Sequence, residues 1–573
     1  MKSTTRLHLL LFCFLLIGFL ILSRLFYWQV LNFEQLAAAA EEQHFISLEI
    51  PASRGRILAA DEFPLVTNKE AFLVFASIPD LEESAEEIAA QLAPLFATPS
   101  ARLAIEEMMK ERLKREDLVW VPLNHKVARE TKEAIEKLNL AGIGFEEEEK
   151  RGYPEGSSAA HLLGFVGSDI SGRDKGYFGL EGLYDWQLRG RPGMVHQERD
   201  ALGRPILIGG FGQEKSEDGR DLVLFLDRAV QFIVEEKLKW GIEKYGAKAG
   251  SVVVMDPQTG GILAMASYPD YDPAEHVKFA KETYKNPIIA DLFEPGSIIK
   301  PFIMSAALNE EVVTPKTECD RCGGPRVIGE HTISTFNDEY FPNSTIAEVI
   351  EHSDNVGMVF VAEKLGHEKV YEYLAKFGLG ERTEIDLEEE TSGDLRPKDE
   401  WRKIDLATAA FGQGVALTRM QITRAFSALA NQGKLLQPLV VKKILTPEEE
   451  IEIQPKEAYQ VIKPQVAKMI TEMLVSATEK SPLRFPRNRI PELNGYRIAA
   501  KSGTAQIPVA GHYDPEKTIA SVIGFAPADN PRFTILVSLT EPTARPWGSD
   551  TAGPIFFQIL KELFIYYGIQ PGG

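Results

Sequence analysis

A serine and a lysine three residues apart could together attack a carbonyl group. They are Ser297 and Lys300, and residues 293–296 before them read Phe-Glu-Pro-Gly. Pro and Gly ahead of an apolar run predict a helix start, and residues three apart share one helix face. A desolvated Lys300 with a lowered pKa could take the Ser297 proton, and the helix N-terminus would stabilise an oxyanion. Alone the pattern is weak, because a capping serine and a surface lysine would look the same.

A second polar group follows about 55 residues later as Ser353-Asp354-Asn355, after a predicted helix over residues 345–351. The Ser353 hydroxyl could relay a proton between Ser297 or Lys300 and a leaving amine. The Asn355 carboxamide could bind a backbone amide of a substrate. Taken alone, the segment is equally typical of a polar turn between two helices.

A third group, Lys501-Ser502-Gly503-Thr504, follows strand-like residues 496–500. Gly503 would let another backbone approach closely. Lys501 and the hydroxyls of Ser502 and Thr504 could hold a substrate carboxylate, and the Thr504 N–H could be a second oxyanion donor. By itself this is a strand end followed by a turn. The three groups in this order are, however, the set found in class A β-lactamases and penicillin-binding proteins.

With these motifs the chain resembles class B penicillin-binding proteins along nearly its whole length. Further matching segments are residues 251–269, 411–414 with Thr418, and 524–527 in the C-terminal half, and residues 54–57 and 179–181 in the N-terminal half. Residues 291–301 and 495–498 are most similar to the septal, division-specific type. Two departures are residues 58–61, where an Asp-Arg-Asn-Gly-like turn is usual, and Ser502, where Thr is commoner.

The resemblance implies an α+β fold, in which a penicillin-binding, β-lactamase-like transpeptidase domain with an antiparallel sheet flanked by helices stands on an elongated α+β pedestal. It implies that Ser297 attacks the penultimate D-alanine of a stem peptide, that Lys300 is the base and that Ser353 relays protons. Asn355 would orient the peptide, Lys501, Ser502 and Thr504 would hold its carboxylate, and Gly503 completes that strand motif. The acyl-enzyme would pass to the amine of a second stem, and β-lactams would acylate the same serine.

The resemblance also implies partners and a location. Substrates would be peptidoglycan stem peptides and their lipid-linked precursor, and the partners a polytopic membrane glycan polymerase and other division proteins. Neither a metal nor an organic cofactor is expected. The chain lacks a glycosyltransferase motif of the Glu-Asp-x-x-Phe kind, so cross-linking without glycan polymerisation is expected. A formal charge of −20 argues against nucleic acid as a partner.

The N-terminus predicts a membrane anchor. Lys2 and Arg6 precede an apolar run over residues 7–22, and aromatic residues follow Arg24. Basic residues in front favour a cytoplasmic N-terminus, so we expect a tail over residues 1–6, a single span over 7–30 and an extracytoplasmic remainder. The alternative is a cleaved signal peptide, but the Ala-rich residues 38–40 lie far beyond the apolar run.

After the anchor, composition predicts a helical stalk over residues 32–43 and a pedestal domain over 31–221 with helices at 81–95 and 101–115. The transpeptidase domain is predicted over 222–573. It should hold a strand at 222–226, a helix at 228–245, a hairpin of residues 251–255 and 262–266, strands at 521–525 and 533–539, and a last helix at 554–567. Strands at both ends with helices between them indicate a central antiparallel sheet.

The cysteines leave three alternatives. Cys319 and Cys322 form a C-x-x-C among Gly and Pro, and a tetrahedral zinc site needs four ligands. A local loop disulfide is therefore preferred over free thiols and over a metal site.

Other functions compete with cross-linking. A β-lactamase would need a glutamate for deacylation, but Glu388, Glu389 and Glu390 start no Glu-x-x-x-Asn pattern and are typical of a solvated loop. A D,D-carboxypeptidase would differ only in using water as acceptor. A mainly non-catalytic scaffold that activates a glycan polymerase at division remains open, whereas a sensor would need more than six residues before the span.

Overall fold

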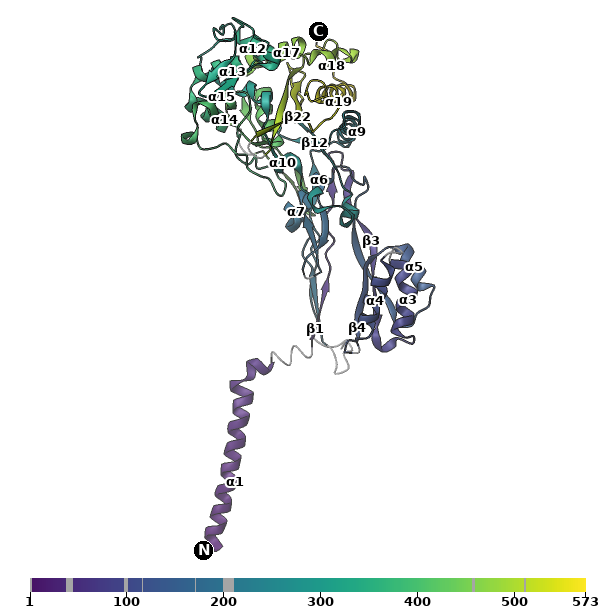
Figure 1. Cartoon of the computed structure of the whole chain (residues 1–573). Coiled ribbons are helices and arrows are strands. Elements are labelled where there is room, and N and C mark those ends of the chain that lie inside the picture. Colours follow the sequence, from purple (N-terminus) through teal and green to yellow (C-terminus); the bar gives the residue numbers. More distant parts are fainter. Residues whose placement is uncertain are drawn as a thin grey trace. The chain divides into compact units, whose positions relative to one another are not determined.

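The computed structural model describes residues 3–37, 45–96, 101–115, 117–170, 172–198, 211–455, 459–509 and 512–572 (Figure 1). The chain divides into two units. One consists of Met1–Arg54 and Arg189–Gly219, and the other of Gly55–Leu188 and Arg220–Gly573.

The first unit contains the N-terminal helix and a small sheet. Helix α1 spans Ser3–Phe26 and continues as a π-helical turn, Tyr27–Leu31. The apolar stretch Thr4–Leu31 has 28 residues, none buried within the protein, and is long enough to cross a bilayer. It is consistent with a single-pass membrane anchor. Of the predicted stalk, residues 33–37 are helical and residues 38–43 lie outside the described part.

The sheet of the first unit is antiparallel, in the order β1-β8-β9. Its strands are β1 (Phe45–Ile50), β8 (Gly193–Glu198) and β9 (Phe211–Glu214). Because β1 lies more than a hundred residues before β8, the sheet joins the two separate segments of this unit.

The second unit contains a seven-stranded sheet of order β19-β18-β10-β2-β3-β4, with β5 also paired to β3. The strands are β2 (Ile57–Leu58), β3 (Pro64–Ser77), β4 (Trp120–Val127), β5 (Ile143–Gly152), β10 (Asp221–Leu224), β18 (Val441–Leu445) and β19 (Glu450–Glu452). The predicted boundary between residues 221 and 222 thus falls inside β10. Since β10 pairs with both β2 and β18, this sheet holds strands from both sides of that boundary.

Three helices pack beside β3 around a separate apolar core. They are α3 (Ala85–Phe96), α4 (Arg102–Leu113) and α5 (Arg129–Glu136). The helices predicted at 81–95 and 101–115 are confirmed as α3 and α4, each shorter by a few residues. Their buried residues, among them Ile88, Leu92 and Met109, recur at helical spacing, so the apolar pattern of the sequence predicts both helices.

Two sequence segments of the N-terminal half meet at a buried ion pair. Arg151 donates to Glu181 at 2.7 Å, to the carbonyl of Gly55 at 2.6 Å and to Asn68 at 2.7 Å. Both charged side chains are buried. The segments 54–57 and 179–181, the latter at the start of α7 (Gly179–Leu183), are therefore joined through Arg151.

The departure at residues 58–61 is accommodated by a tight turn. The Ala59 N–H donates to the Phe63 carbonyl at 2.9 Å, and the Glu62 N–H donates to the Ala59 carbonyl at 2.9 Å. Glu62 takes a φ of 63°, in the left-handed region that turns require. The loop between β2 and β3 thus closes without the usual sequence.

The central sheet of the catalytic region is five-stranded and antiparallel throughout, in the order β12-β11-β23-β22-β21. The strands are β11 (Ala249–Met255), β12 (Ile262–Tyr268), β21 (Ala499–Val509), β22 (His512–Ala526) and β23 (Phe533–Thr540). The predicted hairpin, the strand at 222–226 (as β10) and the two C-terminal strands are confirmed. So are the helices at 228–245 and 554–567, as α9 (Arg228–Tyr245) and α19 (Ala552–Tyr566).

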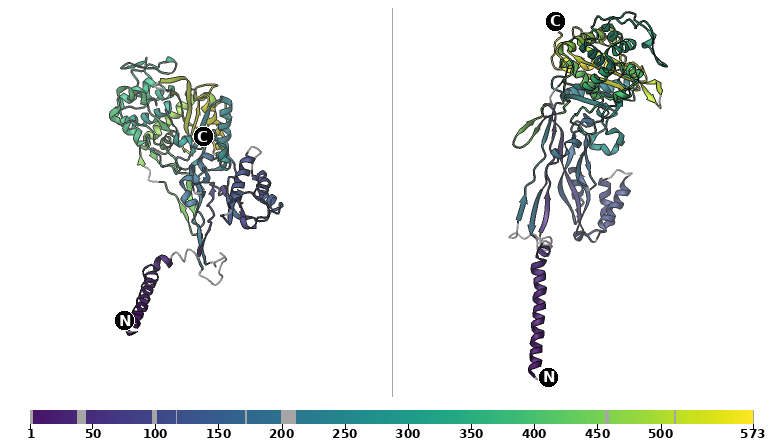
Figure 2. Two further views of the ribbon diagram at one scale, coloured as in Figure 1. Left: turned by 60° about the horizontal axis from the view of Figure 1, so that its bottom comes forward. Right: turned by 90° about the vertical axis from the view of Figure 1, so that its left-hand side faces the viewer.

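Helices cover both faces of this sheet (Figures 1 and 2). On one face, α9 and α19 pack against residues such as Ile535 and Val537 of β23. On the other, Leu536 faces a larger helical core. That core includes α11 (Lys300–Asn309), α12 (Ile346–His352), α13 (Asn355–Leu365), α14 (His367–Lys376), α16 (Arg419–Ala430) and α17 (Pro464–Lys480). The predicted α+β architecture is confirmed.

The remaining elements are short. They are α6 (Ala160–Leu163), α8 (Asp185–Leu188), α10 (Pro287–Ala290), α15 (Lys403–Ala409), α18 (Arg484–Asn488), β6 (Phe165–Ser168), β7 (Asp174–Tyr177), β13 (Leu292–Phe293), β14 (Arg326–Ile328), β15 (His331–Ile333), β16 (Leu417–Thr418), β17 (Lys434–Leu435) and β20 (Tyr459–Gln460). Cys319 and Cys322 form a disulfide, as the preferred alternative expects, and both are buried beside α13.

Candidate active site

Ser297 lies in a tight turn that leads into a buried helix. The turn is a 3₁₀ segment, Gly296–Ile299, rather than the first turn of an α-helix, and α11 follows at once. Gly296 has a φ of +57°, and its N–H donates to the Gly412 carbonyl at 3.0 Å. Gly412 itself has no room for a side chain, since a Cβ there would lie 2.1 Å from the Gly296 carbonyl oxygen. The segment 411–414 thus fixes the turn that carries Ser297.

The Ser297 side chain is half-buried, and its hydroxyl makes no hydrogen bond within the described part of the chain. Lys300, three residues on, is fully buried. Its Nζ donates to the Ser353 carbonyl at 2.5 Å, to Ser353 Oγ at 3.2 Å and to Asn355 Oδ1 at 2.8 Å. All three acceptors are neutral. Burial, reinforced by the charge of Lys501, lowers the pKa of Lys300 well below its usual value.

The second motif occupies the junction of two helices. Thr345 begins α12 with a capping box, and α12 ends at Ser353, which takes a left-handed conformation with φ 56°. Asp354 caps α13 by accepting the Gly357 N–H at 3.1 Å. The backbone reversal at Ser353 points its hydroxyl at the lysines instead of continuing the helix. The predicted helix over 345–351 is confirmed.

The Asn355 carboxamide uses part of its hydrogen-bonding capacity within the protein. Its Oδ1 accepts from Lys300, and its Nδ2 donates to the Ser334 carbonyl at 3.1 Å. A carboxamide offers two N–H donors and two acceptor lone pairs. One donor and one acceptor are therefore left for a peptide substrate.

Lys501 extends from β21 to the same serine. Its Nζ donates to Ser353 Oγ at 2.9 Å and to the Ser502 carbonyl at 3.0 Å. Burial lowers the pKa of Lys501 to about 7. The two buried lysines from different motifs therefore meet at one hydroxyl, and burial favours the uncharged form of both.

A hydrogen bond of Ala500 shows which backbone groups of β21 point outward, that is, away from the neighbouring strand β22. Among the strands that the structure describes, β21 lies at an edge of its sheet and pairs with β22 alone. The Ala500 N–H donates to Thr478 Oγ1 at 3.0 Å, so Ala500 directs its backbone away from β22. Backbone groups alternate sides along a strand. Ser502 and Thr504 consequently direct their N–H and C=O groups outward as well.

Gly503 brings the strand against the nucleophile turn. A Cβ at Gly503 would lie 2.9 Å from Ile298 and 3.0 Å from the Pro295 carbonyl oxygen. A Cβ at Gly296 would lie 3.1 Å from the Thr504 carbonyl oxygen. The Thr504 hydroxyl accepts the Gly548 N–H at 3.0 Å. Ser297 and the outward edge at Thr504 are thus neighbours.

The strand prediction at residues 496–500 was wrong in part. β21 begins only at Ala499, and the third motif lies inside an 11-residue strand instead of at a strand end. Residues 496–498 are held by side chains: the Tyr496 ring stacks on Phe564 at 4.3 Å, and Arg497 forms ion pairs with Glu472 and Asp529. Pairing with the long β22 extends the strand through Ser, Gly and Thr, which local propensity disfavours.

A carboxylate that the sequence reading did not single out lies next to this site. Glu294 accepts the Gly414 N–H at 3.0 Å and the Tyr513 hydroxyl at 3.0 Å. Burial raises the pKa of Glu294. Its place three residues before Ser297 was visible in the sequence, but its contact with Tyr513 depends on the β21–β22 register.

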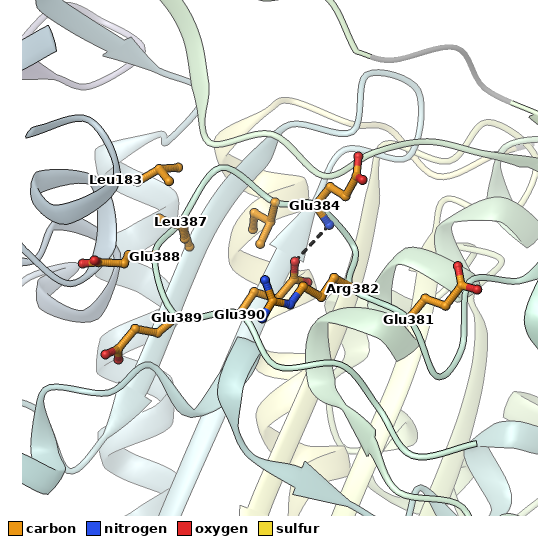
Figure 3. Close-up of a pocket in the computed structure, with 9 residues that line it drawn as sticks. Leu183, Glu381, Arg382, Glu384, Leu387, Glu388, Glu389 and Glu390 are labelled. Atoms are coloured by element: carbon orange, nitrogen blue, oxygen red, sulfur yellow. Dashed lines mark hydrogen bonds between the residues drawn. The ribbon is translucent and has the colours of Figure 1, made fainter. Parts of the chain in front are cut away.

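Two of the acidic residues 388–390, Glu388 and Glu390, accept hydrogen bonds from the backbone, and Glu389 is exposed. They border a cavity of about 580 Å³ lined also by Leu183 and Glu381, away from the motif residues (Figure 3). Glu390 is buried and accepts the Thr383 N–H at 2.7 Å and the Glu384 N–H at 2.9 Å, the bond drawn in Figure 3. Glu388 accepts the Phe178 N–H at 2.8 Å. The expectation of a solvated loop was therefore wrong for Glu390, because it satisfies buried backbone donors.

Comparison with known proteins gives two family matches. A model described as the penicillin binding protein transpeptidase domain matches residues 250–561. A second, described as the penicillin-binding protein dimerisation domain, matches residues 49–224.

Relatives match over most of their length. The stage V sporulation protein D of Bacillus subtilis is 33% identical over 562 residues, covering 97% of this chain and 85% of that protein. The probable peptidoglycan D,D-transpeptidase PenA of Neisseria gonorrhoeae is 31% identical, and the match covers 100% of this chain and 94% of that protein. Among solved structures, a peptidoglycan synthetase from Bifidobacterium adolescentis has a TM-score of 0.74 at 28% identity, covering 92% and 98%. Penicillin binding protein 3 of Mycobacterium tuberculosis, complexed with ampicillin, has a TM-score of 0.69 at 26% sequence identity. The match covers 92% of this chain and 98% of that chain.

Proposed function

Because the chain belongs to the class B penicillin-binding proteins, which join a dimerisation domain to a peptidoglycan D,D-transpeptidase domain, we propose that it cross-links stem peptides through an acyl-enzyme on Ser297. The supporting observation is the meeting of the three motifs at Ser353. Both Lys300 and Lys501 donate to its hydroxyl, both are buried, and within the described residues their hydrogen-bond acceptors are neutral.

In the first step Ser297 Oγ attacks the carbonyl carbon of the penultimate D-alanine. The uncharged Nζ of Lys300 accepts the serine proton, and the N–H groups of Ser297 and Thr504 hold the oxyanion. The C–N bond then breaks. The leaving D-alanine amine takes up a proton delivered through the Ser353 hydroxyl, which gives the Ser297 ester.

In the second step the amine of a neighbouring stem attacks the ester carbonyl. It loses a proton to the base, a new amide bond forms, and Ser297 regains its proton as it leaves. During the first step, before the C–N bond breaks, Lys501 in its charged form holds the terminal carboxylate of the donor with the hydroxyls of Ser502 and Thr504, and Asn355 orients the donor backbone. A β-lactam follows the first step, but its amine stays tethered after the ring opens, so the ester persists.

The division of the chain and its setting are part of the proposal. Residues 1–6 form a cytoplasmic tail, 7–30 cross the membrane once, 31–221 form the pedestal, and 222–573 form the extracytoplasmic transpeptidase domain. The resemblance of residues 291–301 and 495–498 to the division-specific type supports a role at the septum. There the anchor and pedestal engage a polytopic glycan polymerase and other division proteins.

The test is acylation of the full-length protein in detergent. A fluorescent penicillin should give a stable adduct that peptide mass mapping places on Ser297, and Ser297→Ala should give none. Ser305→Ala, a buried serine of α11 outside the motifs, is the matched control and should label normally. An adduct elsewhere, or none on folded protein, would overturn the proposal. Products of a pentapeptide donor with an added amine distinguish transfer from release of free acid, which a carboxypeptidase would favour.

A further inference from the structure

Asp354 is a buried carboxylate that the acyl-transfer steps do not use. The residue is only 1% exposed. Its Oδ1 caps α13 by accepting the Gly357 N–H at 3.1 Å, whereas its Oδ2 is buried without a hydrogen-bond partner among the residues that the structure describes. Because Asn or Ser caps a helix about as well as Asp does, the cap alone does not require a buried charge.

Asp354 lies between the two residues that hold Lys300. The Lys300 Nζ donates at 2.5 Å to the Ser353 carbonyl, which belongs to the peptide bond that joins Ser353 to Asp354. The same Nζ donates at 2.8 Å to Oδ1 of Asn355, the residue after Asp354. Lys300 is therefore held against the backbone on both sides of Asp354, and the charges of the two side chains act on each other.

Few other charges act on this pair. The charge of Lys501, from β21, acts on Lys300, and that of His352, at the end of α12, acts on Asp354. Within the described part of the chain, Asp354 is thus the one anionic group that acts on Lys300. The other buried carboxylate at this end of α12 is engaged with a lysine of α17 at 2.8 Å, in the pair Glu351–Lys480.

The charge of Asp354 opposes the effect of burial on Lys300. Burial, and then the charge of Lys501, lower the pKa of Lys300, whereas the charge of Asp354 raises it. Burial raises the pKa of Asp354, but the Gly357 N–H and the charge of Lys300 lower it. The helix dipole also favours an ionised carboxylate at the N-terminus of α13. A negative charge at this position would keep Lys300 more basic than burial alone leaves it.

We propose that Asp354 is a positioning residue for acyl transfer, whose carboxylate is the buried counter-charge for the ammonium that forms on Lys300. That ammonium forms when the Ser297 O–H bond breaks and its proton passes to the Lys300 Nζ as the Oγ–C bond forms. Proton transfer slows as a base weakens, so the carboxylate increases the rate of this step. The inference rests on the proposed function, since it needs Lys300 to be the base, and it deepens that function by one electrostatic element.

The first test is Asp354→Asn in the full-length protein in detergent, which removes the charge and keeps the cap. The rate constant for acylation by a fluorescent penicillin is measured from about pH 5 to about pH 10, across the range in which a lysine with a lowered pKa titrates. At its plateau the rate should fall about threefold to tenfold, because the base is weaker. On the acidic side the midpoint should move to lower pH by about one unit, because the lysine now gains its proton less readily.

A second background shows whether the effect passes through the lysine. In Lys300→Met, which lacks the base, adding Asp354→Asn should leave the residual acylation rate unchanged within about twofold. A carboxylate that only shapes the site would lower the rate by the same factor in both backgrounds. Equal factors would therefore overturn the inference.

Two further variants separate the charge from the cap. Asp354→Ser, another neutral cap, should reproduce the plateau and midpoint of Asp354→Asn. Asp227→Asn is the matched control, because Asp227 caps α9 by accepting the Ala229 N–H at 2.9 Å, and α9 covers the opposite face of the central sheet from α11. It should change neither the plateau nor the midpoint, and urea unfolding checks that every variant is folded.

The two proposals fail in different ways. If the wild type forms the Ser297 adduct but the midpoint in Asp354→Asn stays in place or moves to higher pH, the carboxylate serves only as a cap and this inference alone is overturned. If folded wild type forms no adduct on Ser297, the acyl-enzyme proposal fails and this inference with it.

Discussion

Two regions of the second unit bury basic side chains in opposite ways. Arg151 in the N-terminal half is buried against a carboxylate, Glu181, that is also buried. Lys300 and Lys501 in the catalytic half are buried with hydrogen bonds only to hydroxyl, amide and carbonyl oxygens. In the first region the cation is hydrogen-bonded to a carboxylate, whereas in the second the nearest carboxylate, Asp354, acts on Lys300 only through its charge.

The consequence lies in the protonation state. A paired guanidinium stays charged and serves as a structural link between distant segments. Burial without a hydrogen-bonded carboxylate lowers the pKa of Lys300 well below its usual value and that of Lys501 to about 7, which favours the uncharged, proton-accepting form. Burial is the same in both regions, so the partner decides whether a buried cation supports the fold or performs chemistry.

The largest effect is expected at Lys300. Lys300→Met keeps the length of the side chain but removes the base, so acylation of Ser297 by penicillin should slow about 10²- to 10⁴-fold. The free energy of unfolding should stay equal or rise, because an apolar group suits this buried position better than an amine. Stopped-flow or gel-based acylation rates and urea unfolding measure the two quantities.

This prediction has a clear contrary outcome. If Lys300→Met destabilised the protein strongly while acylating at the normal rate, Lys300 would resemble Arg151, and the contrast between the regions would fail. Lys364→Met on α13 is the matched control, since this lysine lies over the Phe360 ring away from the motifs and should change neither quantity much.

At Arg151 we expect a loss of unfolding free energy without a change in the acylation rate, the reverse of the result at Lys300. Arg151→Met takes the ion-pair partner away from the buried Glu181 carboxylate and removes the donors to Gly55 and Asn68, which should cost about 3–5 kcal/mol of unfolding free energy. The acylation rate per folded molecule should be unchanged. Adding Glu181→Gln should recover part of the loss, because a neutral amide loses less than a carboxylate when the guanidinium is absent. Calorimetry and urea unfolding measure the stability, and parallel penicillin labelling measures the acylation rate. An unchanged stability or a slower acylation in Arg151→Met would contradict the prediction.

The pH dependence of stability tests Lys501. Its folded pKa of about 7 lies below the usual lysine value of about 10.4, so between these limits the unfolded chain binds more protons than the folded one. Stability should therefore rise with pH across this window, by about 1.4 kcal/mol per pH unit from this lysine alone. Urea unfolding from pH 7 to 10 should show a slope smaller by that amount in Lys501→Met. Equal slopes would mean that Lys501 is paired after all.

The sequence predicted the elements better than their ends. The hairpin β11–β12, made of two apolar runs joined by a turn, and the helices α9 and α19 were placed within two residues. β21 was misjudged, because Lys-Ser-Gly-Thr has no strand pattern of its own and is extended by pairing with β22. The seven-stranded sheet was not foreseen, because β2, β10 and β18 come from distant segments.

The candidate site shows the same limit. Ser297, Lys300, Ser353 and Lys501 could be named from three short motifs, and the structure brings both lysines to Ser353, with the turn that carries Ser297 packed against β21. Their assigned roles remain predictions. Glu294 and Tyr513 were not named as a pair, because 219 residues separate them and only the hairpin register joins them. Motifs reveal residues that act locally, whereas partners fixed by long-range pairing need the fold.

The smallest effect is expected at Arg56, which lies next to Gly55 in the same N-terminal segment that Arg151 binds. Arg56 donates to Asp221 at 2.9 Å and 2.6 Å, a geometry as good as that of Arg151, but its side chain is 54% exposed. Water already solvates an exposed guanidinium, so Arg56→Gln should cost less than about 1 kcal/mol of unfolding free energy. In about 1 M salt that cost should shrink further, while the cost of Arg151→Met persists. A loss at Arg56 as large as that at Arg151 would show that bond geometry, rather than burial, sets the strength of these ion pairs.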